Sequence, residues 1–273
     1  LRSFDELYTV IDSDGDNLRK KTPSATYNLG VFSSSGSTIT TLDISPRLDV
    51  NYVFLATDER KRFADAEHQY LIHTLQKVEN IITPTTNSAG DTSTIDLKFQ
   101  HPVSNLIWYF RRSDFNDYNQ FYNFTNWPDK NIDPVINNGD YNDFKAEDTF
   151  SSSTIHSLKR KDLLMNATLK FNGVARFNVK NANMFNLVNN YQHMTRIPED
   201  GIYVYSFNLN LDITKHQPTG ACNFSYVNNP QLEITTTPKV NTGDNYTYDI
   251  VVFALNYNVL RIVGGMGDLE YSN

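Results

Sequence analysis

Apolar and polar residues alternate along several stretches of this chain. In residues 94–101 every second residue is apolar, from Ile95 to Phe99, and the residues between them are polar or charged. Successive side chains of a strand point to opposite faces, so this alternation predicts a strand with one buried face. Three further stretches show the same pattern: residues 163–172, 202–211 and 248–263.

Each of these three stretches has one apolar face. In residues 163–172 it comprises Leu163, Met165, Ala167, Leu169 and Phe171. In residues 202–211 it comprises Tyr203, Tyr205, Phe207, Leu209 and Leu211. In residues 248–263 it comprises Val251, Phe253, Leu255, Tyr257 and Val259.

Additional strands are expected where Val, Ile, Tyr, Phe and Thr gather: residues 49–55, 69–79, 103–112, 222–227 and 231–236. Turn-forming sequences such as Asn172-Gly173 and Pro198-Glu-Asp-Gly201 separate the predicted strands. Many short strands with turns between them predict an all-β protein, an antiparallel sandwich or barrel in which a second sheet covers the apolar faces.

Two short helices are expected among the strands. Thr57-Asp58-Glu59 favours a helix that runs to about Ala66, with Thr57 as the N-cap and two acidic residues in the first turn. A second helix is predicted near residues 183–191, where apolar residues recur with helical spacing. We expect that stripe to pack against the protein; it comprises Met184, Leu187, Val188 and Tyr191.

Residues 113–153 lack a sustained period and are rich in Asp, Asn, Ser, Tyr and Phe. They are interpreted as a long surface loop, since loops of this length in a compact domain are usually functional or flexible.

Composition narrows the class of protein. The 273 residues are 39% hydrophobic and 13% aromatic, which is enough for a core and argues against disorder throughout. The net charge of −7 argues against direct binding of nucleic acid, which normally requires a basic face. The single cysteine, Cys222, rules out an intrachain disulfide and is interpreted as a small buried apolar residue. No apolar run approaches the length of a membrane span.

Candidate chemistry is sparse. No two of the six histidines have a metal-ligand spacing; they are His68, His73, His101, His156, His193 and His216. Asp12-Ser-Asp14-Gly-Asp16 begins like a calcium loop, but Pro23 stands where the closing Glu is needed, so a plain acidic turn is favoured. The sequence therefore offers no catalytic, cofactor-binding or metal-binding residues, and we expect neither an enzyme nor a cofactor.

Four N-glycosylation sequons are present, at Asn123, Asn166, Asn223 and Asn245. Chance occurrence in an Asn-rich chain is the preferred interpretation, and glycosylation of the four residues stays open.

A set of ordered motifs in the chain resembles one family. They are Tyr52-Val-Phe-Leu-Ala-Thr-Asp-Glu-Arg-Lys-Arg-Phe-Ala64, Tyr70-Leu-Ile72, His101-Pro-Val-Ser-Asn-Leu-Ile-Trp108, Phe171-Asn-Gly-Val-Ala-Arg-Phe177, Tyr191-Gln-His-Met-Thr-Arg196, Gly201-Ile-Tyr-Val-Tyr-Ser-Phe207, His216-Gln-Pro-Thr-Gly-Ala-Cys-Asn-Phe-Ser225, Asn256-Tyr-Asn-Val-Leu-Arg-Ile262, Gly264-Gly-Met-Gly267 and Tyr271-Ser-Asn273. Together they cover roughly residues 50–273 and resemble the major capsid protein of large eukaryotic (nucleocytoplasmic) DNA viruses.

The resemblance implies two successive jelly rolls. Residues 57–273 look like the second, C-terminal jelly-roll domain, and residues 1–56 look like the closing strands of a first roll that is mostly absent. The chain opens at Leu1 without an initiator Met, which suggests that it starts partway through a longer polypeptide.

The resemblance also implies a function: a structural subunit of an icosahedral capsid, assembled in the host cytoplasm and located in the virion shell. Family members form homotrimers with a pseudo-hexagonal outline. The implied partners are neighbouring capsomers and minor capsid proteins, with contact to an inner membrane only through other proteins.

Two other classes of function remain as alternatives. A carbohydrate-binding sandwich is suggested by Tyr118, Tyr122 and Trp127, whose rings could stack on sugars. A jelly-roll metalloenzyme would need ligands that converge from distant strands.

Overall fold

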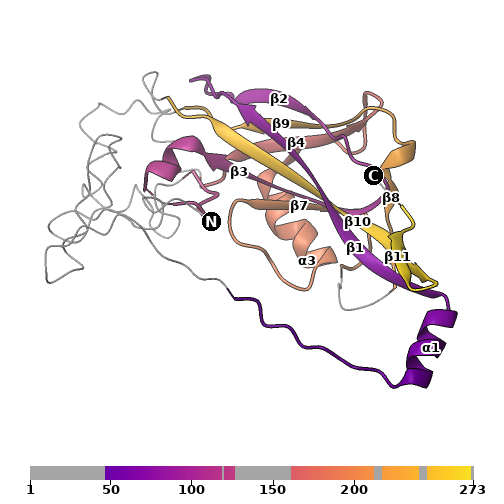
Figure 1. Cartoon of the computed structure of the whole chain (residues 1–273). Coiled ribbons are helices and arrows are strands. Elements are labelled where there is room, and N and C mark those ends of the chain that lie inside the picture. The colour runs from indigo at the N-terminus through magenta and orange to yellow at the C-terminus, as the bar shows by residue number, and fades with distance from the viewer. Residues whose placement is uncertain (1–46, 119, 127–160, 212–216, 240–244, 272–273) are drawn as a thin grey trace, which may run out of the picture.

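The computed structural model describes residues 47–118, 120–126, 161–211, 217–239 and 245–271. Two antiparallel sheets pack against each other over these residues (Figure 1). The first sheet contains β1 (His68–Ile82), β10 (Tyr248–Val263), β3 (Pro102–Arg112), β7 (Ile202–Ser206), β11 (Met266–Leu269) and β8 (Cys222–Asn223). The second contains β2 (Asp91–Asp96), β9 (Pro230–Thr236), β4 (Leu164–Phe171), β5 (Val174–Ala175) and β6 (Lys180–Asn181).

The strand order is that of a jelly roll. The first sheet runs β1-β10-β3-β7 and the second β2-β9-β4-β5. Following the chain, successive long strands alternate between the sheets, and the last long strand, β10, lies between β1 and β3. Such crossing between two antiparallel sheets defines the jelly roll among β-sandwiches. The predicted all-β jelly-roll fold with short helices is confirmed.

The core fills the space between the sheets. Its largest fully buried side chains include Trp108 and Phe110 of β3 and Tyr203 of β7, which lie on the inner face of the first sheet. The second sheet contributes residues such as Leu169 and Ile234. Aromatic rings of the first sheet, packed against aliphatic side chains of the second, therefore account for much of the buried apolar area that stabilises the fold.

Most of the strands predicted from alternation are confirmed. β10 covers the whole of residues 248–263, and β1, β3, β9 and β4 match their predicted ranges to within a few residues. In β4 a bulge between Leu164 and Asn166 interrupts the alternation, so Leu163 and Leu164 are both buried and Met165 is only half-buried.

Four predicted strands are wrong in part. The strand predicted at residues 94–101 is β2, which covers Asp91–Asp96, so residues 97–101 lie outside it. β7 ends at Ser206, where the Ser206 hydroxyl donates to the backbone oxygen of Asn208 at 3.1 Å and turns the chain, so Leu209 is 76% exposed. Residues 222–227 form only the two-residue β8, since Asn223 caps the 3-10 helix η5 (Phe224–Tyr226). Residues 49–55 are extended but pair with no strand among the described residues.

Helix α1 (Thr57–Asp65) occupies the predicted position, but its predicted cap is wrong. The N-cap is Ala56, which makes no side-chain cap bond, and Thr57 is already helical. Asp58 and Glu59 do lie in the first turn. Each helix among the described residues is too short or too polar to cross a membrane.

The second helical segment forms as predicted but faces the other way. The π-helix η4 (Met184–Val188) continues into α3 (Asn189–His193), and three of the four residues of the expected apolar stripe lie on its outer side: Leu187, Val188 and Tyr191. The buried side carries Ala182, Phe185, Asn186, Asn189 and Asn190. The prediction that the stripe packs against the protein is therefore wrong for these three residues and confirmed for Met184, which is half-buried against the core.

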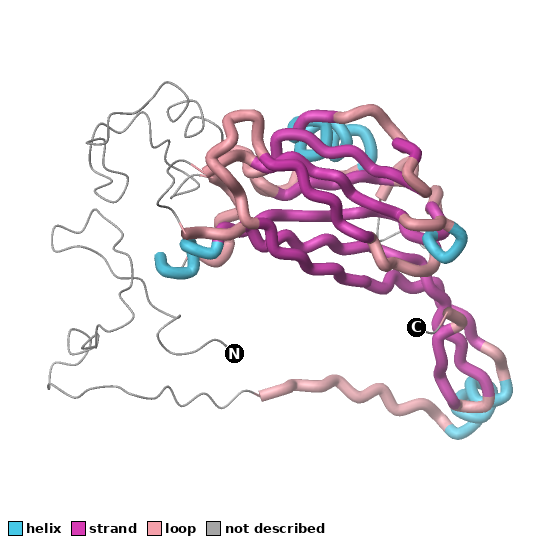
Figure 2. The backbone as a smooth tube through the Cα atoms, turned by 90° about the horizontal axis from the view of Figure 1, so that it is seen from above, coloured by secondary structure: helices cyan, strands magenta, loops and turns pink. Residues whose placement is uncertain are grey.

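The two ends of the sandwich differ in shape. Figure 2 shows α1 and the paired ends of β1, β10 and β11 extending beyond one end. Residues 47–56 stand apart from the sheets in both views, and all of their side chains are exposed (Figures 1 and 2). The opposite end is formed by the start of β10 and the end of β3, since Tyr248 pairs with Arg112.

Candidate functional site: a buried anchor for the long connection

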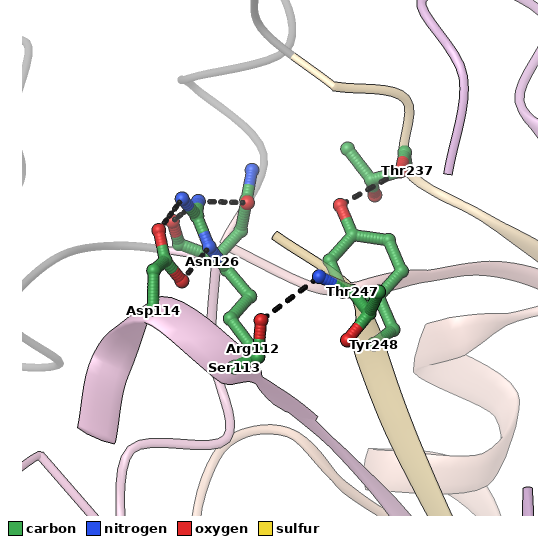
Figure 3. A network of polar contacts seen from close by, with 7 residues as sticks. All are labelled: Arg112, Ser113, Asp114, Asn126, Thr237, Thr247 and Tyr248. Carbon is green, nitrogen blue, oxygen red and sulfur yellow. Dashed lines mark hydrogen bonds and ion pairs between the residues drawn. The ribbon is translucent and has the colours of Figure 1, made fainter. Parts of the chain in front are cut away.

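The connection between β3 and β4 begins at a buried arginine. Alternation along β3 places Arg112 on the same side as Phe110 and Trp108, facing the interior, and Arg112 is only 2% exposed. A buried guanidinium is costly unless it is paired and hydrogen-bonded. Its partner is Asp114: Arg112 Nε donates to Oδ1 at 3.0 Å, and Nη2 donates to Oδ2 at 2.6 Å (Figure 3). This two-bond geometry is the strong form of an Arg–carboxylate pair.

The remaining surface of the guanidinium is covered by three further residues. Arg112 Nη1 donates to the backbone oxygen of Asn126 at 3.3 Å and to its Oδ1 at 3.1 Å. The guanidinium carbon lies 3.9 Å from the ring centre of Tyr246 and 4.8 Å from that of Phe115. Both contacts are cation–π interactions. We name Arg112, Asp114, Phe115, Asn126 and Tyr246 the anchor.

Electrostatics keep the anchor charged. Burial alone would lower the pKa of Arg112, but the hydrogen bonds and negative charge of Asp114 outweigh burial, so the pKa is raised above its usual value. Arg112 and Asp114 therefore form an ion pair.

The far end of the connection returns to the same place. The backbone nitrogen of Asn126 donates to the Lys161 oxygen at 2.7 Å. Next along the chain, the Asp162 carboxylate accepts from the Tyr203 hydroxyl at 3.1 Å, and the Asp162 backbone oxygen accepts from Thr237 Oγ1 at 2.9 Å. The outgoing and returning segments are thus fixed beside each other before β4 begins.

The start of β10 is joined to the same region. Ser113 and Thr247 exchange two bonds: Ser113 N donates to the Thr247 oxygen at 3.0 Å, and Thr247 N donates to Ser113 Oγ at 2.9 Å. The Tyr248 hydroxyl donates to the Thr237 oxygen at 2.9 Å (Figure 3). Burial raises the pKa of Tyr248 and that of Tyr203 well above the usual tyrosine value, so both hydroxyls keep their protons and act as donors.

Residues 120–126 pack closely onto the sandwich. The ring of Phe124 lies 4.5 Å from that of Tyr109, centre to centre. Gly201 approaches so closely that a Cβ there would lie 2.2 Å from the Phe124 oxygen, and its φ of +84° also favours glycine. The first part of residues 113–153, predicted as surface loop, is therefore packed structure where it is described, while residues 127–153 lie outside the described residues.

The sequons fall in different environments. Asn123 is 1% exposed and its Oδ1 accepts from Thr125 N at 3.1 Å and Thr125 Oγ1 at 2.7 Å. Asn166 is half-buried within β4, Asn223 caps η5, and Asn245 is exposed. Of the four sequon asparagines, Asn245 is the one with an exposed side chain.

The other candidate residues do not converge. In the part of the chain that the structure describes, no three His, Cys, Asp or Glu side chains are grouped so that they could hold a metal ion. The segment at Asp12–Asp16, His156 and His216 lies outside that part. Cys222 is half-buried against the core, and burial raises the pKa of its thiol, which disfavours the reactive thiolate.

The carbohydrate-binding hypothesis is left with one described side chain. Tyr122 is 74% exposed. The side chain of Tyr118 and all of Trp127 lie outside the described residues, so the hypothesis stays a prediction.

The sequence-based analysis did not find the anchor. The available signal was an arginine at an inward-facing position of a predicted strand, followed two residues later by Asp114. Arg112 and its partners have a mechanical role, because they hold separate chain segments together through hydrogen bonds and cation–π contacts. Fold and site together define a jelly-roll protein in which this buried polar cluster stabilises the fold.

Comparison with known proteins identifies the family. The family model described as large eukaryotic DNA virus major capsid protein matches residues 59–268. The major capsid protein of Phaeocystis pouchetii virus is 32% identical over 283 residues, covering 83% of this chain and 53% of that protein. That of Pyramimonas orientalis virus is 33% identical over 252 residues, covering 84% and 49%. The chain belongs to the major capsid protein family of large eukaryotic DNA viruses, and the predicted resemblance is confirmed.

A solved structure agrees with this assignment. The quasi-atomic model of the PBCV-1 virus capsid matches with a TM-score of 0.58 at 29% identity, covering 81% of this chain and 56% of that chain. The chain spans about half the length of the curated relatives it matches.

Proposed function

We propose that the chain is a structural subunit of an icosahedral viral capsid and forms trimeric, pseudo-hexagonal capsomers that tile the shell. The observation that supports this most directly is the family match over residues 59–268, which coincides with a closed jelly roll from β1 to β10. The protein acts in the virion shell after assembly in the host cytoplasm, has no enzymatic role and uses no cofactor.

The geometry suits a wall element. β10 runs unbroken through 16 residues, a length of roughly 50 Å at about 3.3 Å per residue. The anchored connection lies at its start, and the Gly264-Gly265 turn and α1 lie at its end. We infer that the end with the anchor faces outward, where a long connection can meet the surroundings, and that the α1 end faces the interior of the particle.

We further propose the domain division expected from the sequence. Residues 1–56 supply closing strands of a first jelly roll, and residues 57–273 form the second. Residues 47–56 support this, since Tyr52, Val53 and Phe54 are 77%, 84% and 91% exposed on an extended backbone that pairs with no strand in the described part of the chain. Large apolar side chains that follow one another along an extended segment favour pairing of that segment with a sheet, which would cover them.

The proposed partners follow from the same role. They are two further copies in the trimer, neighbouring capsomers and minor capsid proteins, while contact with an inner membrane runs through other proteins. Direct binding of nucleic acid is not part of the role, in keeping with the net charge of −7.

Imaging of native particles and light scattering of the purified protein test the proposal. We expect capsomers with three-fold symmetry, into which this sandwich fits with the anchor outward, and a trimeric mass in solution. A particle without three-fold capsomers, or a protein that stays monomeric at high concentration, would overturn it.

A further inference from the structure

The helical segment of residues 184–193 is turned with its apolar side outward. Leu187, Val188 and Tyr191 are 46%, 43% and 82% exposed, although they share one face of the helix. The opposite face buries asparagines: Asn186, Asn189 and Asn190 are all at most 6% exposed. A surface helix normally has the reverse arrangement, with apolar residues inward.

Hydrogen bonds hold the helix in this orientation. Asn186 Nδ2 donates to the Ile202 oxygen at 2.9 Å, and Asn189 Nδ2 donates to the Val204 oxygen at 2.8 Å. Both acceptors belong to β7, the edge strand of its sheet, so the asparagines satisfy backbone groups that an edge leaves unpaired. Phe185 fixes the same side, with its ring centre 5.1 Å from that of Trp108. Turning the apolar face inward would break all of these contacts.

Three side chains make up this exposed apolar face of the helix. We name Leu187, Val188 and Tyr191 the outer stripe. Exposed clusters that contain aromatic and large aliphatic side chains are typical of the buried centre of protein interfaces.

Charge indicates what covers the outer stripe. Residues 181–195 contain no Asp, Glu, Lys or Arg, whereas the whole chain carries 31 acidic and 24 basic residues. Two copies that each carry a net charge of −7 repel each other overall. They can approach most closely where charges are absent, and the outer stripe is such a place.

We propose that the outer stripe is a subunit interface covered by a second copy of this chain. The inference rests on the proposed self-assembly and names the surface that carries it. A closed three-fold ring requires heterologous contacts, so the outer stripe of each copy meets a different surface on the next copy. Tyr191, the most exposed member, is the expected centre of the contact.

The test compares the oligomeric state of the wild-type chain with that of two variants, Tyr191→Asp and Leu187→Asp, over a range of concentrations by light scattering and native mass spectrometry. Because both side chains are exposed and neither belongs to the buried core, the variants should fold, and circular dichroism checks this. Tyr226→Asp is the matched control, since Tyr226 is 87% exposed but lies on η5. We expect each stripe variant to raise the concentration needed for assembly about tenfold or more, and the control to leave it unchanged.

The outcomes separate the two proposals. Assembly that survives both stripe substitutions overturns the interface assignment and leaves the trimeric subunit intact. A wild-type chain that stays monomeric at all concentrations overturns both, because a second copy then does not cover the stripe.

Discussion

Arg112 and Asp114 are two residues apart in sequence, and their side chains meet in two hydrogen bonds, 3.0 and 2.6 Å long, at the buried end of β3. Asp114 keeps about a quarter of its side chain exposed, whereas Arg112 is almost fully enclosed. Loss of the pair would therefore cost Arg112 more than Asp114, because of the two only Asp114 retains access to water.

Replacing Asp114 with Ala should lower the free energy of unfolding by about 3–5 kcal/mol, because it leaves a buried guanidinium without its counter-charge. Urea denaturation measures the change. The matched control is Glu79→Ala, which removes an exposed ion pair with Lys77 and should cost less than about 1 kcal/mol. Equal effects of the two substitutions would show that the anchor contributes nothing special to stability.

Gly201→Ala should destabilise the protein much more than Gly173→Ala. Both glycines have a positive φ, +84° and +79°, so both substitutions carry a backbone cost of about 1–2 kcal/mol. Only at Gly201 does the new Cβ collide with the backbone of Phe124; around Gly173 nothing lies within 4 Å. Thermal melting of the two variants measures the difference, and similar melting temperatures would mean that residues 120–126 do not pack as described.

Stability should fall as the pH rises above about 10. Burial raises the pKa of Tyr203 and Tyr248 well above the unfolded value of about 10, so the unfolded chain loses these protons first. The stabilisation is fully present below pH 10 and is lost as the pH rises through the folded-state values. Urea denaturation follows the loss of stability between roughly pH 8 and pH 11. This range runs from about two units below to about one unit above the usual tyrosine pKa.

Tyr248→Phe serves as the internal check on this pH dependence. It removes one titrating hydroxyl and should flatten the alkaline fall in stability, at the cost of the bond to the Thr237 oxygen. Tyr226→Phe, at an exposed position, should leave the pH profile unchanged. An identical profile for wild type and Tyr248→Phe would contradict the expectation.

Replacing residues 127–160 with a linker of about four Gly and Ser residues should preserve the fold, because Asn126 N and the Lys161 oxygen are already 2.7 Å apart. We expect the melting temperature to change by no more than a few degrees. The control replaces residues 120–160, which also removes the Asn126 bonds to Arg112, and should lower stability clearly. If the variant that lacks only residues 127–160 fails to fold, the two sheets depend on that segment for their stability.

Local alternation predicted the long strands because a strand with one buried face leaves a period of two in the sequence. It assigned the apolar face of β10 to Val251 and Phe253, and this choice is wrong because Ile250 and Val252 make the other face apolar as well. The structure places Ile250 and Val252 in the core. Pairing with β1 and β3, which decides the matter, is set by residues far away in the sequence.

The helical stripe at Leu187 and Tyr191 shows a different limit. Periodicity found the helix but not its orientation, because the asparagines opposite the stripe carry no apolar signal. They face inward because β7 ends its sheet and needs donors for the Ile202 and Val204 oxygens. That need becomes visible only when the sheet order is known.

Arg112 could not be placed from local sequence either. A charged residue at an inward phase of β3 looks like a strand end, and its burial requires Asn126 and Tyr246 to fold over it from separate segments. Those contacts depend on tertiary packing, which overrides the preference of arginine for water.

The hydrogen bond between Asn126 N and the Lys161 oxygen brings the two ends of the connection together beside the sheets. The entropy cost of a closed loop grows only slowly with its length, by about 0.6 kcal/mol for each doubling. Sequence between these two residues can therefore lengthen, shorten or change without a compensating change in the sheets. With the anchor facing outward, as proposed, changes in this segment would alter the outer surface of the particle and leave the two sheets unchanged.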